Sequence, residues 1–184
     1  MKNVLIITGD GGESYETLYA KHRFEEAGFG VEIAAPDKKL LNLVMHDFEP
    51  GWDTYTERKG YYVQADLSIS EADAKNYDAI LLIGGRAPEY LRNDPKVISL
   101  VQEFDKMEKY IFAICHGIQV LVTAQLVKDR NVTCYEHVKF EVESCGGTFD
   151  GKNEAVRDGR LVTGQTWQSH PQFYRLVFEC LHEA

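Results

Sequence analysis

The fold is decided by residues 110–121, which read YIFAICHGIQVL. The first letters, YIFAI, form an apolar run typical of a buried strand, and the apolar letters that follow the glycine recur at helical spacing. Cys115, His116 and Gly117 therefore occupy the corner between a predicted strand and a predicted helix. Because a sharp corner pushes a side chain out of the packed layer, we predict a nucleophile elbow at Cys115.

The same alternation of strand and helix patterns continues on both sides of this corner. Apolar runs predict further strands, and helical spacing predicts helices that end at glycines or begin after prolines. Such alternation is typical of an α/β fold, with a mostly parallel central sheet sandwiched by helices. The predicted strands are 4–7, 31–35, 78–83 and 131–135, with more in 148–164 joined by turns at Asp150-Gly151 and Asp158-Gly159; the predicted helices are about 15–27, 97–104, 138–145 and 171–181.

The chain length predicts one domain, residues 1–184, with a substantial core. One segment interrupts the alternation: residues 40–60 are irregular and rich in Asp, Gly and aromatic residues, and we interpret them as an ordered excursion that includes a hairpin. The aromatic residues of this region are interpreted as packing or interface residues: Trp52, Tyr55, Tyr61 and Tyr62.

The composition disfavours two classes of partner. The formal net charge is −9, from 20 Lys and Arg against 29 Asp and Glu. Phosphate binding needs clustered cations, so neither nucleic acid nor an anionic membrane is an expected partner. The opening residues MKNVLIIT are too short for a membrane span and no cleavage site follows them, so we interpret them as the first buried strand and expect a cytoplasmic protein.

Four cysteines are present, at positions 115, 134, 145 and 180, and their irregular spacing favours free thiols over disulfides. No zinc spacing is found, and His46, Asp47 and Asp53 fit no familiar metal site, so no metal is predicted. Cys115 has two interpretations. It is either a small buried hydrophobic residue or a nucleophile whose thiolate is stabilised by the start of the following helix.

Parallel sheets place their sites at the carboxyl ends of their strands, where we predict three loops, 8–16, 84–90 and 115–117. Two acidic residues lie in the first of these loops. Glu13 and Glu16 are three residues apart at the start of a predicted helix and therefore close together on its surface. They either cap the helix and complement its dipole, or direct a carboxyl at Cys115. In the second case burial beside the thiol raises the pKa of the carboxyl, which then serves as a proton shuttle.

Backbone groups offer a further function near the same corner. Gly84 and Gly85 end a predicted strand, and their N–H groups, with that of His116, either stabilise an oxyanion or only form a tight turn. Gly117 allows another chain segment to pass close by. The His116 side chain need not point at its neighbour, and a carboxylate such as Glu89 is a candidate to orient it.

These motifs together resemble the PfpI/ThiJ family of the glutamine-amidotransferase-like superfamily. The resemblance rests on GGRAPEYLRND at 84–94, AICHG at 113–117, TCY at 133–135 and DGRLVTG at 158–164. It extends over almost the whole chain and implies a flavodoxin-like fold.

The resemblance also implies roles for individual residues. It makes Cys115 the nucleophile and Glu16 its buried carboxyl partner, with Glu13 at a second acidic position. His116 matches the histidine that follows the nucleophile, and Glu89 matches the acid that approaches this histidine across a subunit boundary. By the same likeness, Gly85 and the His116 backbone form the oxyanion site, and the protein is a homo-oligomer.

Within the family the chain is most similar to the plant two-domain glyoxalase III group, although it carries one copy of the domain. GDGGESYE at 9–16, HDFEPGWDTYTERKG at 46–60 and LVTGQTWQSHPQF at 161–173 carry this likeness. Compact protease-like members lack the segment 40–60.

Three functions follow as hypotheses. The first is a cofactor-independent glyoxalase that converts methylglyoxal or glyoxal to a 2-hydroxy acid through a Cys115 hemithioacetal, with related deglycase activity. The second is an intracellular cysteine peptidase or amidase that uses Cys115, His116 and Glu89, although a histidine adjacent in sequence is poorly aimed. The third is a stress chaperone or sensor in which Cys115 oxidises to a sulfinic acid held by Glu16.

Overall fold

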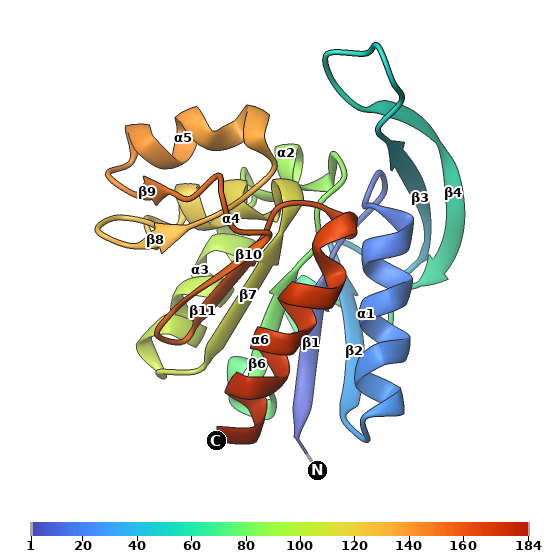
Figure 1. The fold of residues 1–184 in the computed structure, drawn as a ribbon. Coiled ribbons are helices and arrows are strands. Elements are labelled where there is room, and N and C mark those ends of the chain that lie inside the picture. Colours follow the sequence, from blue (N-terminus) through green and yellow to red (C-terminus); the bar gives the residue numbers. More distant parts are fainter. Residues whose placement is uncertain (1, 184) are drawn as a thin grey trace.

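The computed structural model describes residues 2–183, in which a seven-stranded sheet has the strand order β10-β11-β7-β6-β1-β2-β5 (Figure 1). Every neighbouring pair in this sheet is parallel except β10 and β11. Its strands are β1 (Asn3–Ile7), β2 (Gly30–Ala35), β5 (Leu67–Ser68), β6 (Ala79–Leu82), β7 (Tyr110–Ile114), β10 (Ala155–Asp158) and β11 (Leu161–Gly164). The predicted α/β class with a mostly parallel sheet is confirmed.

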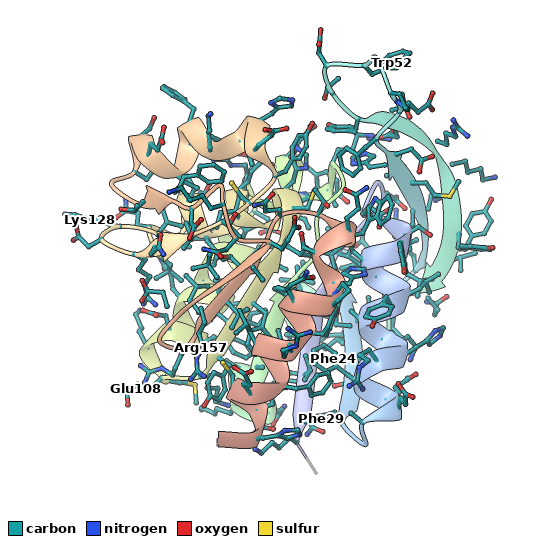
Figure 2. The ribbon with its side chains drawn as sticks, in the orientation of Figure 1. Phe24, Phe29, Trp52, Glu108, Lys128 and Arg157 are labelled. Carbon is teal, nitrogen blue, oxygen red and sulfur yellow. The ribbon has the colours of Figure 1, made fainter. Side chains whose placement is uncertain are left out.

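Helices cover both faces of the sheet. α1 (Ser14–Glu26) and α6 (His170–Glu183) lie side by side in front of it in Figure 1, and α3 (Pro95–Lys106) lies behind it. Aromatic rings join α1 to α6, with the Phe24 and Phe178 ring centroids 5.7 Å apart. Phe24 has no exposed surface, and burying such a ring stabilises the fold by roughly 1.5–3 kcal/mol. Figure 2 shows Phe24 and Phe29 close together near the end of α1. Their ring centroids are 6.1 Å apart.

The excursion predicted at 40–60 is a long antiparallel hairpin of β3 (Leu40–Asp47) and β4 (Thr56–Gln64), separate from the central sheet. The hairpin rises beside the start of α1 (Figure 1), and the Tyr61 N–H donates to Ser14 Oγ at 3.1 Å. Trp52 lies in its connecting loop at the far end (Figure 2). A second anchor is the Trp167 indole N–H, which donates to the His46 carbonyl at 2.7 Å. The hairpin is thereby held over the carboxyl ends of the central strands.

Two local predictions need correction. Only Asn131–Val132 of the predicted strand 131–135 is a strand, β8, and it pairs with β9 (Thr148–Phe149) in a separate small sheet. The turn at Asp150 therefore does not join two paired strands. The Asp150 carboxylate accepts the N–H of Lys152, and the chain turns there toward the central sheet. Residues 84–90 are also not all loop, since they include most of the short helix α2 (Ala87–Leu91).

The remaining helices support the carboxyl end of β7. α4 (Ile118–Thr123) continues from the predicted elbow, and α5 (Lys139–Ser144) packs on α4. Between β7 and α4 the chain makes one turn of 3-10 helix, Cys115–Gly117. The strand, corner and helix predicted from residues 110–121 are confirmed, and this corner lies at the same edge of the sheet as the loops after β1 and β6.

Candidate active site

The backbone at Cys115 is left-handed, with φ at +58°. A non-glycine residue rarely adopts this conformation, and such residues concentrate at functional sites because the surrounding structure must hold them there. The turn is held by close packing: a Cβ on Gly117 would lie 2.4 Å from the Leu82 carbonyl oxygen. Gly117 therefore acts through this close approach, as its sequence position suggested.

The Cys115 Sγ atom lies 3.3 Å from His116 Nδ1. Side chains that are adjacent on a regular helix diverge, so this contact was not expected from the sequence. The left-handed backbone at Cys115 changes the direction of its side chain and brings the sulfur to the imidazole. Cys115 and His116 are both buried, with 4% and 5% of their surface exposed.

Glu16 projects from the first turn of α1 to the same place. Its Oε2 accepts a 2.8 Å hydrogen bond from the Gly84 N–H, whereas its Oε1 is buried without a hydrogen-bond partner. A Cβ on Gly84 would lie 2.6 Å from Cys115 Cβ and 2.7 Å from Glu16 Oε2. The thiol of Cys115 and the carboxyl of Glu16 can therefore approach each other only because residue 84 is a glycine and has no side chain.

Glu13 connects this carboxyl to the hairpin. It caps α1, with Oε2 accepting from the Glu16 N–H at 2.6 Å, and its Oε1 accepts from the His46 N–H at 3.4 Å. Burial raises the pKa of Glu13 from 4.5 to about 7, although these backbone hydrogen bonds act in the opposite direction. Glu13 thus has the capping role that was one of its two predicted roles.

Burial controls the protonation of the site. It raises the pKa of Glu16 well above its ordinary value, and the charge of Glu13 adds to this effect. The raised pKa favours the protonated form of Glu16. Burial also lowers the pKa of His116 to about 4, so this imidazole is neutral and able to accept a proton.

The thiolate predicted from the sequence is not the resting form. Burial raises the pKa of the Cys115 thiol well above its ordinary value, with a further contribution from the Glu16 charge. The backbone N–H groups of His116 and Gly85 oppose this shift, but α4 has only six residues and its dipole is correspondingly weak. Protonation of Glu16 removes its contribution to the raised pKa of the thiol, and the thiol proton has an acceptor in His116 Nδ1.

The predicted oxyanion groups divide into two sets. The N–H groups of Gly85 and His116 interact with the sulfur, whereas the Gly84 N–H is taken by Glu16. Gly85 adopts φ +74°, and a Cβ there would lie 2.4 Å from the Gly11 carbonyl oxygen, so the glycine lets two loops touch. Gly84 is thus placed to hold the carboxyl, and an oxyanion role for Gly85 and His116 stays a prediction.

Glu89 was predicted to approach His116 across a subunit boundary. It is exposed on α2, and the carboxylate whose charge acts on His116 is instead Glu141 of α5. Glu141 accepts a hydrogen bond from Gln119 Nε2 at 2.9 Å. The role of Glu89 across a subunit boundary stays a prediction.

Aromatic side chains around His116 were not predicted as part of the site. The ring of Tyr135 lies 5.1 Å from that of His116, and the ring of Tyr55 lies 5.5 Å from it. His46 stacks on Tyr55 at 4.0 Å. The sequence carried one usable signal: His46 alternates with Val44 on the buried side of β3, where a histidine is unusual.

Two further tests concern metals and membranes. Within residues 2–183, no group of three His, Cys, Asp or Glu side chains is arranged to hold a metal ion, and this includes the set of His46, Asp47 and Asp53. In the same part of the chain, every helix is either too short or too polar to cross a membrane. Within the described residues, none of the four cysteines forms a disulfide.

The fold and the site define an α/β protein with a cysteine at a strand-to-helix corner and a buried carboxyl beside it. The chain belongs to the DJ-1/PfpI family, which it matches over residues 2–180. The family predicted from the sequence motifs is thereby confirmed.

Relatives and solved structures agree with this assignment. The chain is 37% identical to Protein DJ-1 homolog D of Arabidopsis thaliana over 94% of its own length, but spans only 46% of that protein. It is 33% identical to Deglycase TK1284 of Thermococcus kodakarensis, covering 88% of this chain and 89% of the relative. Bacillus subtilis has a relative named "Putative cysteine protease YraA", 31% identical over 90% of this chain and 89% of the relative. The DJ-1/ThiJ/PfpI-like and ferritin-like two-domain protein of Anabaena variabilis has the same fold, with a TM-score of 0.86, 24% identity, and coverage of 99% of this chain and 48% of that one.

Proposed function

We propose that this protein is a glyoxalase-type enzyme that converts methylglyoxal or glyoxal to a 2-hydroxy acid without glutathione, and that it also acts on early aldehyde adducts of amines and thiols. The observation that carries the proposal is the Glu16 carboxyl. It is buried, which raises its pKa and favours its protonated form, it lies beside the Cys115 thiol, and one of its oxygens has no hydrogen-bond partner. No cofactor is part of the proposed reaction.

The first step joins Cys115 to the aldehyde. Sulfur attacks C1, His116 Nδ1 takes the thiol proton, and Glu16 gives its proton to O1, forming a hemithioacetal. The Glu16 carboxylate then removes the hydrogen from C1 as a proton and returns it to C2, while a proton moves from O1 to O2. The product is a thioester of the 2-hydroxy acid on Cys115.

Hydrolysis completes the cycle. Water adds to the thioester carbon and gives a proton to Glu16, and the C1–S bond breaks as His116 returns its proton to Cys115. The groups finish in the protonation states in which they began. No net oxidation occurs, because C1 is oxidised and C2 is reduced within one molecule.

The test is consumption of methylglyoxal and formation of lactate without glutathione. We expect Cys115→Ala to abolish turnover, whereas Cys145→Ala, a change to a half-buried cysteine on α5's end, leaves it unchanged. Equal rates for wild type and Cys115→Ala reject the proposal. Selective oxidation of Cys115 by mild peroxide without turnover of any aldehyde supports a redox sensor instead.

The deglycase component needs a separate measurement, since free aldehyde leaves early adducts spontaneously. Relatives named deglycases support this activity. We expect the enzyme to remove a methylglyoxal adduct of a model amine faster than the adduct releases aldehyde on its own. If the rate never exceeds that of spontaneous release, the deglycase component is rejected and only the glyoxalase activity remains proposed.

A cysteine peptidase or amidase is the second candidate. It is favoured by the 3.3 Å contact between Cys115 Sγ and His116 Nδ1, which supplies the base that the sequence left poorly aimed. Peptide hydrolysis that is lost in both Cys115→Ala and Glu89→Gln supports it. The second loss points to the partner subunit, because Glu89 is exposed within one chain.

Self-association is part of the proposal. Aromatic side chains on α1 and the hairpin are left open to solvent: Tyr15 is 49%, Tyr61 70% and Tyr62 48% exposed. Tyr15 and Tyr61 line the same surface pocket, whereas Tyr62 points to the other side of β4. Exposed apolar surface of this kind is typical of interfaces. Light scattering should give at least a dimer mass, and a monomer at micromolar concentration contradicts this part.

A further inference from the structure

His46 is a buried histidine that has no role in the reaction steps described so far. It is 2% exposed, and its ring lies 6.3 Å from that of His116, edge to face. The same ring stacks on Tyr55, and the charge of a Cys115 thiolate raises the pKa of Tyr55 after the larger effects of burial and Glu89. His46 therefore lies beside Tyr55 and His116, two of the rings next to the reactive cysteine.

One side of the His46 ring is firmly held. Nε2 lies 2.9 Å from Glu57 Oε2, and Arg86 Nε donates to both oxygens of Glu57 at 2.8 and 2.9 Å. Burial alone would raise the pKa of Glu57, but the hydrogen bonds from His46 and Arg86 hold it below its ordinary value. A carboxylate only accepts, so Nε2 carries the proton of the ring.

The other nitrogen of the ring has no partner. Nδ1 of His46 is buried and makes no hydrogen bond. Leaving a buried polar atom unpaired is unfavourable, and an unpaired atom kept at a reactive site is best explained by a ligand that pairs with it. A second orphan, Glu16 Oε1, belongs to the same site, and Glu13 accepts from the backbone N–H of both residues.

We propose that His46 is a second proton carrier of this site, which moves the proton between the two oxygens of the Cys115 adduct. The inference rests on the proposed function. That isomerisation needs two transfers, C1 to C2 and O1 to O2, and one carboxyl cannot serve both at once. Nδ1 of His46 takes the O1 proton and returns it to O2, and the Glu57 carboxylate stabilises the imidazolium formed in between.

The kinetic test compares His46→Gln and His46→Ala with His22→Gln, a change to an exposed histidine on α1. We expect kcat for methylglyoxal to fall about 10²–10⁴-fold in both His46 variants, with KM and the rate of Cys115 alkylation by iodoacetamide within about twofold of wild type. Added imidazole should restore turnover to His46→Ala, where it fits the space left, and not to His46→Gln. A parallel loss of alkylation and turnover, or no response to imidazole, overturns the proposal in favour of a structural role.

A second measurement does not depend on turnover. Propylene oxide converts Cys115 to a 2-hydroxypropyl thioether, which places a hydroxyl where O2 of the product lies. We expect the ¹⁵N signal of His46 Nδ1 to shift on this modification, and the signal of His22 to stay. An unmoved His46 signal in a modified protein contradicts the placement of Nδ1, whereas wild type that turns over no aldehyde contradicts the proposed function alone.

Discussion

The N–H of Gly84 donates a 2.8 Å hydrogen bond to Oε2 of Glu16 and leaves Oε1 of that carboxyl unpaired. This one contact joins the loop after β6 to the start of α1. It fixes which oxygen of Glu16 is structural and which is available for chemistry. The first two predictions follow from it.

Replacing Glu16 by Gln separates structure from proton transfer. The amide has the shape of the protonated carboxyl, and its oxygen accepts the Gly84 N–H. We therefore expect the thermal unfolding temperature to stay within a few degrees of wild type while aldehyde turnover falls about 10²–10⁴-fold. Calorimetry and a lactate assay measure the two effects. Turnover close to wild type would remove Glu16 from the mechanism.

Gly84→Ala tests the close approach. The new Cβ would lie 2.6 Å from Cys115 Cβ and 2.7 Å from Glu16 Oε2, so the thiol and the carboxyl must move apart. We expect at least a tenfold loss of turnover, since small misplacements of reacting groups are costly. Gly28→Ala is the control: it also introduces strain, at φ +83°, but has open space and lies at the far end of α1. Equal activity losses in the two variants would attribute the effect to stability.

Much of this arrangement was predictable from local patterns. The turn at Cys115–Gly117 follows from a change of hydrophobic period, and Glu16 follows from its place in a loop after a strand. The contact between Cys115 and His116 could not be predicted from the sequence. It depends on the left-handed backbone of Cys115, with φ at +58°, and no residue type in this stretch indicates that conformation. Nor did the raised pKa of the thiol, which comes from burial by residues distant in the chain.

The hairpin contribution was the least predictable part. His46 and Tyr55 join the site only because β3 and β4 fold back over α1, a tertiary event without a local signal. Once this register is known, the alternation along β3 places His46 on its buried side. Glu89 shows the converse case: its motif predicts a contact with His116 across a subunit boundary, and this contact stays a prediction.

Stability should depend on pH through Glu13. Its pKa is raised from 4.5 to about 7, so between these values the folded chain binds more protons than the unfolded chain. The free energy of unfolding therefore falls as pH rises through this window. Glu13→Gln removes the effect, and its stability relative to wild type should rise by about 3 kcal/mol between pH 4.5 and pH 8. Urea unfolding at several pH values measures the difference, and a difference that does not change with pH would contradict the raised pKa.

The two tryptophans give a matched pair for the hairpin. The Trp167 N–H donates to the His46 carbonyl at 2.7 Å, whereas Trp52 is 63% exposed in the hairpin loop. Trp167→Phe keeps an aromatic ring but leaves that carbonyl without this donor, which should cost about 1 kcal/mol. Because the bond ties β3 to the turn before α6, hydrogen exchange should accelerate in 44–57 and stay unchanged in the central strands. Trp52→Phe should alter neither quantity. If exchange instead rises across the whole sheet in Trp167→Phe, the hairpin and the core open as one unit, and this bond is not a local anchor of His46.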